Sequence, residues 1–431
     1  MKKIVASVGL VALGTSMIHG VETGALNSYQ NNKAWSVSAT LRGFYDDNIN
    51  TEKNNKDDSV GFEVNPSISY GMAGEMTALN FTYSFSGKYY EERPAGSSDN
   101  WDFTHVIGAD LSHSFSARTS LFLRDSFVVG QEPDVLRSGN AIVGNQRISG
   151  NNIRNYASAK LNTKVTELLG FEVGYDNTFF DYADEGPATS GLFVVAASNS
   201  GLLDRMQHGA NLDSRWTLGE RTTGIVGYRF GLTDFNGDEA IGGLVASPVK
   251  SEDRNSRSHY LYGGLEHAFS PDISGSLRAG AIYTDYYNDA AADPNWNPYL
   301  SANLHYQFLP ESSVDVGLSV DQNASDLVGN TADFVRDTQT IVAYGKVSHR
   351  IFAQLYGSGS LTYQHQIYNG GGTGVDGKAV DYLIVGLNLD YRFNRNLSTS
   401  LGYNFDNVNS DINSGTDYNR NRIYFGVTAT Y

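Results

Sequence analysis

From Trp35 to the last residue, apolar and polar residues alternate along segments of roughly ten to fifteen residues. Val60, Phe62 and Val64, for example, are interleaved with Gly61 and Glu63. A period of two is that of a β-strand, whose successive side chains point to opposite faces. Strands of soluble sandwiches usually have five or six residues, whereas longer strands match a tilted bilayer crossing. The pattern predicts membrane-spanning strands with one oily face and one polar face.

Short and long connections follow one another between these segments. Tight turns are expected at 71–75, 116–118, 166–168, 219–222, 270–272, 310–312, 352–354 and 394–396. Longer polar loops are expected near 46–58, 91–101, 130–152, 183–205, 234–254, 288–296, 323–337, 368–378 and 407–419. These connections predict about 18 strands, and an even number brings both chain ends to the short-turn side. We therefore expect residues 26–431 to form an all-β, transmembrane, antiparallel up-and-down β-barrel.

Hydrocarbon leaves backbone polar groups no partner but one another, so such a sheet has to close on itself. A barrel of this size leaves an aqueous lumen, and no segment between strands is long enough for a separate plug domain. The loops 130–152 and 183–205 are long enough to fold inward and narrow the lumen. The second contains the apolar run 191–195, which we expect to be buried, inside the barrel or against a neighbouring subunit or lipid.

Both chain ends carry features of exported barrels. Lys2 and Lys3 precede a mostly apolar run at 4–18 and then small residues, which predicts a signal peptide over 1–25 with cleavage after Gly20 or Ala25. The final segment alternates and stops on Tyr431, which looks like the signal that outer-membrane barrels offer to their assembly machinery. The expected location is the outer membrane, in contact with its lipid.

Composition narrows the chemistry. The chain has 27 Tyr, 21 Phe and 46 Gly, which suits aromatic girdles and glycine-rich strands. It has no Cys and a net charge of -16, which excludes thiol chemistry and disfavours nucleic acid as a partner. The acidic excess falls in the loops, so we expect either an acidic vestibule that favours cations or a surface kept soluble by charge. Neither a metal site, a cofactor site nor an enzyme is indicated, and homo-oligomerisation is left open.

Charged residues of the polar face form one group of pore-lining candidates. Arg124, Arg154, Lys160 and Lys164 lie on consecutive strands, with Glu172 and Asp176 on the next strand. The candidates continue along the chain with Asp213, Arg215 and Arg229. A basic ladder facing carboxylates would set a transverse field that screens permeants by charge. The alternative is a set of cross-strand salt bridges that satisfies the polar groups of the wall.

Three short motifs resemble the putative β-barrel porin 2 family of outer-membrane proteins: Phe-Tyr-Asp-Asp-Asn-Ile-Asn at 44–50, Phe-Glu-Val-Asn-Pro-Ser-Ile-Ser-Tyr at 62–70 and Tyr-Arg-Phe-Asn-Arg-Asn-Leu-Ser at 391–398. The resemblance implies a barrel and, for some members, a place beside exopolysaccharide export machinery. We expect a porin for passive diffusion of small hydrophilic solutes. The alternatives are a polysaccharide conduit, for which the polar-face Tyr260, Tyr262 and Tyr299 would stack on sugars, and a closed structural or adhesive barrel.

Overall fold

The computed structural model describes residues 34–93, 99–130, 151–183, 186–235, 237–289, 292–325, 327, 334–372, 374–412 and 417–431, and the backbone at 137–138 and 141–142. The predicted signal peptide at 1–25 lies outside these residues, as does most of the loop 130–152. Among the described residues, no helix combines the length and hydrophobicity needed to cross a membrane.

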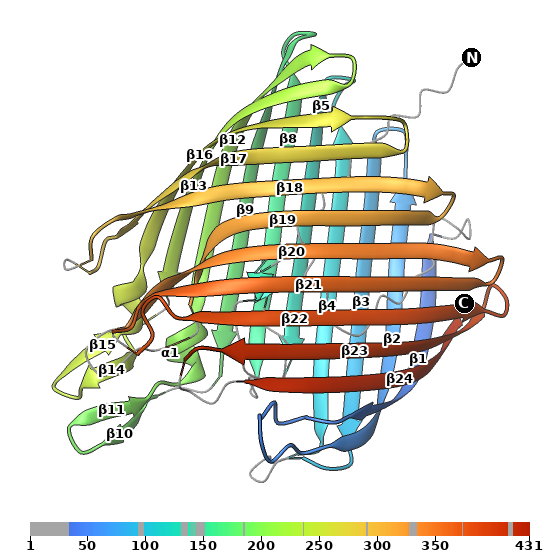
Figure 1. Cartoon of the computed structure of the whole chain (residues 1–431). Coiled ribbons are helices and arrows are strands. Elements are labelled where there is room, and N and C mark those ends of the chain that lie inside the picture. The colour runs from blue at the N-terminus through green and yellow to red at the C-terminus, as the bar shows by residue number, and fades with distance from the viewer. Residues whose placement is uncertain are drawn as a thin grey trace, which may run out of the picture.

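Eighteen antiparallel strands form one closed sheet, because β1 pairs with both β2 and the last strand, β24. Figure 1 shows β24 running beside β1 at the lower right of the barrel. The barrel strands, in the order in which they pair, are β1 Trp35–Asp46, β2 Ser59–Ala73, β3 Thr77–Tyr90, β4 Trp101–Ser114, β5 Thr119–Gly130, β8 Asn152–Lys164, β9 Leu169–Tyr182, β12 Arg205–Gly219, β13 Thr222–Phe235, β16 Ser256–Ala268, β17 Ile273–Tyr286, β18 Asn295–Leu309, β19 Ser312–Ala324, β20 Val335–Phe352, β21 Leu355–Gly370, β22 Ala379–Arg392, β23 Leu397–Ser410 and β24 Tyr418–Thr430.

The predicted strand number and the alternation of short turns with long loops are confirmed. The eight tight turns fall at the predicted positions and share one end of the barrel, where Trp35 and Tyr431 are in ring contact at 5.9 Å. The long loops share the opposite end, which faces the outside of the cell in bacterial outer-membrane barrels. We refer to these as the short-turn end and the long-loop end.

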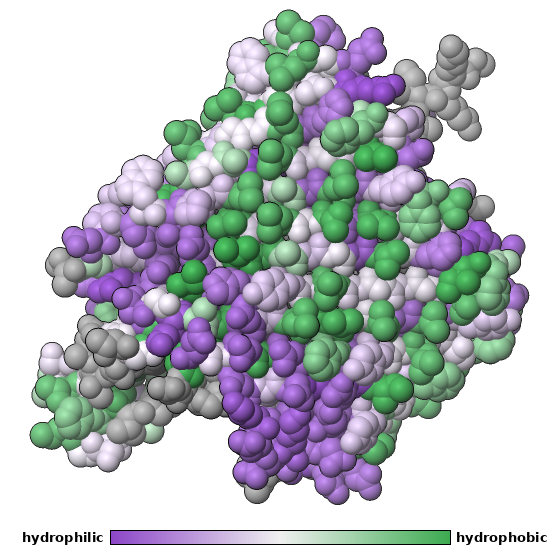
Figure 2. All heavy atoms as spheres, in the orientation of Figure 1, coloured by the Kyte–Doolittle hydropathy of each residue, from purple (hydrophilic) through white to green (hydrophobic). Residues whose placement is uncertain are grey.

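Burial along the strands is the reverse of that in a soluble protein. In β2, Val60 is 54% exposed whereas Glu63 on the other face is 6% exposed. Apolar side chains are spread over the outer surface of the wall in Figure 2, while hydrophilic side chains gather at the bottom of that view. The apolar face therefore meets lipid, and the polar face is the interior face of the barrel.

A smaller sheet projects from the long-loop end. It consists of β10 Ala188–Ser190, β11 Phe193–Ala196, β14 Ala240–Leu244 and β15 Ser247–Lys250, and it extends past the barrel at the lower left of Figure 1. Leu192 and Phe193 are 73% and 46% exposed, so the expectation that the run 191–195 packs inside the barrel is wrong for these two residues, whereas Val194 is 5% exposed. Contact of the run with a neighbouring subunit or lipid stays a prediction. Phe193 pairs with Leu244 at the tip of this sheet, so the run builds a hairpin that reaches away from the lumen.

The remaining elements lie in the long loops. They are the short helix α1 Asn199–Leu203, the 3-10 helix η2 Ser251–Arg254, and the hairpin of β6 Arg137–Ser138 and β7 Ala141–Ile142. Ser198 caps α1, because its hydroxyl accepts a hydrogen bond from the backbone N–H of Gly201 at 3.0 Å.

Candidate functional site in the barrel interior

Acidic and basic side chains form a continuous chain of contacts along the interior face from β8 to β17. Lys160 lies 3.2 Å from Glu172, and Glu172 lies 3.6 Å from Arg215. Arg215 also donates to Glu266, which accepts a further hydrogen bond from Arg278 at 3.2 Å. Each pair joins different strands, so the charges are neutralised along the wall.

A second set of contacts lies one step closer to the long-loop end. The hydroxyl of Tyr262 donates to Asp213 at 2.5 Å, and Arg278 approaches the same carboxylate at 3.9 Å. Asp213 and Tyr262 meet above Gly227 of the intervening strand, where any Cβ would collide with both side chains. The glycine is therefore what allows the carboxylate and the phenol to approach each other.

The third set combines an ion pair with tyrosines. Arg229 donates to Asp176 at 2.8 Å, and Tyr260 donates to Asp321 at 3.2 Å. The rings of Tyr260 and Tyr262 both pack against Tyr299, with centroid distances of 5.6 and 5.3 Å. The interior wall at this level is thus aromatic as well as charged.

Six of the nine sequence-predicted candidates meet in these three sets: Lys160, Glu172, Asp176, Asp213, Arg215 and Arg229. The other three lie elsewhere. Arg124 pairs with Asp110 at 2.5 Å, Arg154 is buried opposite Phe180 at the long-loop end, and Lys164 is exposed beside the short turn at 166–168. The observed pairs have the geometry of cross-strand salt bridges, the alternative to a basic ladder facing carboxylates.

Two features near the long-loop end were missed by the sequence reasoning. Arg254 of η2 is buried, donates to the backbone oxygens of Gly201 and Ser325 at 2.8 and 3.2 Å, and stacks on Phe235 at 3.8 Å. One side chain thereby connects three loops. The second feature is a buried apolar cluster of the interior face and adjoining loops that includes Val335, Tyr368 and Tyr382. The apolar residues of β22 on the even-numbered face, Val380, Tyr382 and Ile384, were the available signal.

Among the described residues, no group of three or more His, Asp or Glu side chains is arranged to hold a metal ion. The arrangement on the interior face is instead suited to wetting a pore, because its charged groups already have partners and still remain accessible to water in part.

A closed antiparallel barrel with an apolar outer face and a charged interior face defines a channel-type protein of the outer membrane. The chain belongs to the family described as putative beta-barrel porin 2, whose family model matches residues 36–431. It is a porin-like channel, as the sequence predicted.

The solved structures that resemble this barrel have low sequence identity to it. OpdK of Pseudomonas aeruginosa with vanillate is 13% identical, with 92% of this chain and 99% of that chain covered and a TM-score of 0.44. OccAB4 of Acinetobacter baumannii is 11% identical, with 93% and 99% covered and a TM-score of 0.43. None of the curated proteins matches the chain.

Proposed function

We propose that this chain is a passive pore for small hydrophilic solutes and that it has no catalytic activity. The observation that carries the proposal is the interior face, where charges on β8, β9, β12, β16 and β17 are paired along the wall. A lumen lined by paired charges stays wet, and it opposes neither cations nor anions strongly. Solutes would then be sorted mainly by size, with a weak preference set by the acidic loops.

Single-channel recording in a planar bilayer tests the proposal. Because the chain contains no Cys, a single introduced thiol is the only target of a charged methanethiosulfonate reagent. Ser301 is opposite Arg278 on the interior face, and its neighbour Ala302 is opposite Leu277 on the lipid face. We expect steady open steps whose conductance falls on labelling in Ser301→Cys and is unchanged in Ala302→Cys. A bilayer that stays silent, or equal effects in the two variants, would contradict the proposal.

The contacts of the interior tyrosines do not favour the polysaccharide conduit. Tyr260 and Tyr262 are only 8% and 7% exposed, their rings pack on Tyr299, and their hydroxyls are bound to carboxylates. Stacking on sugars requires ring faces that are open to the lumen. Conduction that begins only when a periplasmic export partner is added would support the conduit instead.

We also propose export by a signal peptide over residues 1–25 and recognition of the terminal strand by the barrel assembly machinery. The exposed Tyr431 and the alternation of β24 support the second proposal. N-terminal sequencing of protein from outer membranes should give a start at residue 21 or 26. Deletion of Tyr431 should lower the amount of folded barrel in the membrane.

Whether copies of the barrel associate is a separate question, which chemical cross-linking in the membrane determines.

A further inference from the structure

Tyrosines of the lipid face repeat one contact around the barrel. The hydroxyl of each lies within hydrogen-bond distance of an imidazole Nδ1 on the next strand: Tyr83 with His105 at 3.0 Å, Tyr175 with His208 at 2.8 Å and Tyr228 with His259 at 2.7 Å. The strand registers place each histidine two residues nearer the long-loop end than the position opposite its tyrosine. These contacts therefore form a belt at one level, which we call the Tyr–His belt.

The spacing along the strands gives the height of the belt. Ten residues beyond each histidine, at the short-turn end, the lipid face carries a large exposed apolar residue: Phe115 follows His105, Leu218 follows His208, and Phe269 follows His259. A strand tilted by about 40° advances about 2.5 Å per residue along the barrel axis, so the two levels are about 25 Å apart. This matches the apolar band of an outer-membrane barrel, about 25 Å tall. The belt marks the outer edge of the hydrocarbon.

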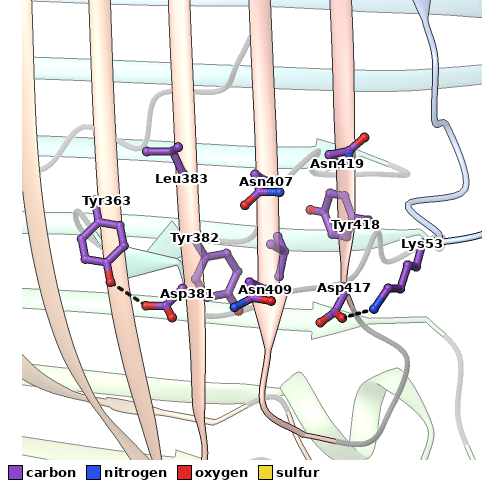
Figure 3. Close-up of a pocket in the computed structure, with 11 residues that line it drawn as sticks. Lys53, Tyr363, Asp381, Tyr382, Leu383, Asn407, Asn409, Asp417, Tyr418 and Asn419 are labelled. Atoms are coloured by element: carbon purple, nitrogen blue, oxygen red, sulfur yellow. Dashed lines mark hydrogen bonds and ion pairs between the residues drawn. The ribbon is translucent and has the colours of Figure 1, made fainter.

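A groove of about 500 Å³ opens at this level on the lipid face between β21 and β24, with both apolar and polar side chains in its lining (Figure 3). Tyr363 makes a related contact there with a carboxylate in place of an imidazole, because its hydroxyl donates to Asp381 at 2.7 Å. Tyr391 follows Asp381 by ten residues, as in the belt. Asn407 and Asn409 of β23 line the groove beside Asp381. The groove lies where lipid headgroups, rather than acyl chains, meet the wall.

Two asparagine amides line the groove. Within the described ranges, the side chains of Asn407 and Asn409 make no hydrogen bond, whereas Asn421 on the adjacent strand accepts one from Tyr403 at 2.7 Å. At the level of the headgroups these amides are open to polar groups of the bilayer surface, so both side chains are available to a bound headgroup. Amide groups both donate and accept, which suits hydroxyl and amide groups of sugars.

Positive charge lies at the outer edge of the groove. The ammonium of Lys53 pairs with Asp417 at 2.7 Å while 60% of its side chain stays exposed, and Lys56 binds the backbone oxygen of Asn419 at 2.9 Å. Both lysines come from the loop between β1 and β2, and Figure 3 shows Lys53 beside Asp417 at the β24 side of the groove. A ligand that reaches from Asn407 to Lys53 would present sugar groups at the membrane and an anionic group above them.

We propose that this groove binds the headgroup of a phosphorylated glycolipid of the outer leaflet. Asn407 and Asn409 hydrogen-bond the sugar, the Asp381 carboxylate accepts from a sugar hydroxyl, and Lys53 and Lys56 attract the phosphate. The groove is separate from the lumen, so binding there requires only that the barrel lie in the outer membrane and does not depend on the pore function.

Native mass spectrometry of the full barrel in detergent tests the site. The probe is a bis-phosphorylated glucosamine disaccharide lipid, compared with its dephosphorylated form and with phosphatidylglycerol. We expect Asn407→Leu with Asn409→Leu to weaken binding of the phosphorylated glycolipid at least ten-fold. Asn404→Leu is the matched control, because it makes the same change on the interior face of the same strand, and it should bind as the unaltered chain does.

Two further measurements separate the possible outcomes. Lys53→Ala with Lys56→Ala should weaken binding of the phosphorylated lipid and leave that of the dephosphorylated lipid unchanged. Heat-dependent gel mobility of each variant reports folding and should be unaltered, and the Asn407/Asn409 variant, which changes only the lipid face, should also keep its single-channel conductance. Equal glycolipid binding by the Asn407/Asn409 variant and the unaltered chain would overturn the proposal, as would equal losses with phosphatidylglycerol. A barrel that binds the phosphorylated glycolipid but gives no single-channel current would contradict the proposed pore function and leave the proposed lipid site in place.

Discussion

The guanidinium of Arg420 at the start of β24 donates to both carboxylate oxygens of Asp46 at the end of β1, with Nε 2.9 Å from each oxygen. Both side chains are 1% exposed. The pair lies across the seam at which the first and last strands meet. The backbone register of the seam is that of an ordinary antiparallel strand pair, and this ion pair adds a buried charged contact to it.

Removing one partner of this pair should destabilise the closed barrel. Because Asp46→Ala leaves a buried guanidinium without its counter-charge, the expected loss is about 3–5 kcal/mol in the free energy of unfolding. Urea unfolding in detergent, followed by heat-dependent gel mobility, measures it. Asp46→Leu with Arg420→Met should cost less than either single alanine variant, because no charge is left buried. Losses that simply add would show that the two residues act independently.

The ion pair of Lys53 with Asp417 predicts a weak pH dependence at the same seam. The hydrogen bond from Lys53 holds the pKa of the Asp417 carboxyl below its usual value of 3.8. Since the folded-state pKa is the lower one, the pair stabilises the fold above pH 3.8 and loses this contribution as the pH falls through the lowered pKa. Both groups are near solvent, so we expect less than about 1 kcal/mol. Carboxyl ¹³C titration should show the Asp417 pKa rising in Lys53→Ala.

Ion selectivity should respond to Glu266, which binds Arg215 and Arg278 together. Glu266→Gln leaves two cations of the interior wall without a full counter-charge. We expect the ratio of cation to anion permeability to fall on the order of two-fold, seen as a shifted reversal potential in a salt gradient. Glu167→Gln, in an exposed short turn, is the matched control and should shift nothing. An unchanged ratio in Glu266→Gln would place this carboxylate away from the ion path.

Gly227 predicts a packing effect inside the wall. A Cβ there would collide with Asp213 and Tyr262, so Gly227→Ala should separate the two side chains and cost about 1–3 kcal/mol. Gly43→Ala on the lipid face, where no atom lies within 4 Å of the added carbon, should be nearly neutral. Urea unfolding of the two variants side by side makes the comparison. Equal stabilities would mean that the wall relaxes around the added methyl group.

Strand number and turn positions could be predicted because apolar and polar residues alternate throughout each strand. The alternation begins and ends with the strand, so its extent in the sequence gives the strand's length. The period does not specify contacts between strands that are not neighbours. Arg215 of β12 meets Glu266 of β16 across an intervening strand, and no spacing in the sequence indicates that. Helix α1 is too short to produce a helical pattern. The apolar residues at 191–195 suggested burial, yet only Val194 is buried there, while Leu192 and Phe193 stay exposed at the end of a hairpin that pairs with β14.

The barrel can close only when β24 is present to pair with β1. The partner of Asp46 lies 374 residues further along the chain, in the last strand of the barrel. An unfinished or clipped chain would expose two unpaired edges to the membrane, where unpaired backbone groups are not tolerated. A truncated chain would therefore not fold stably in the bilayer, and envelope proteases would degrade it. Only full-length copies should persist.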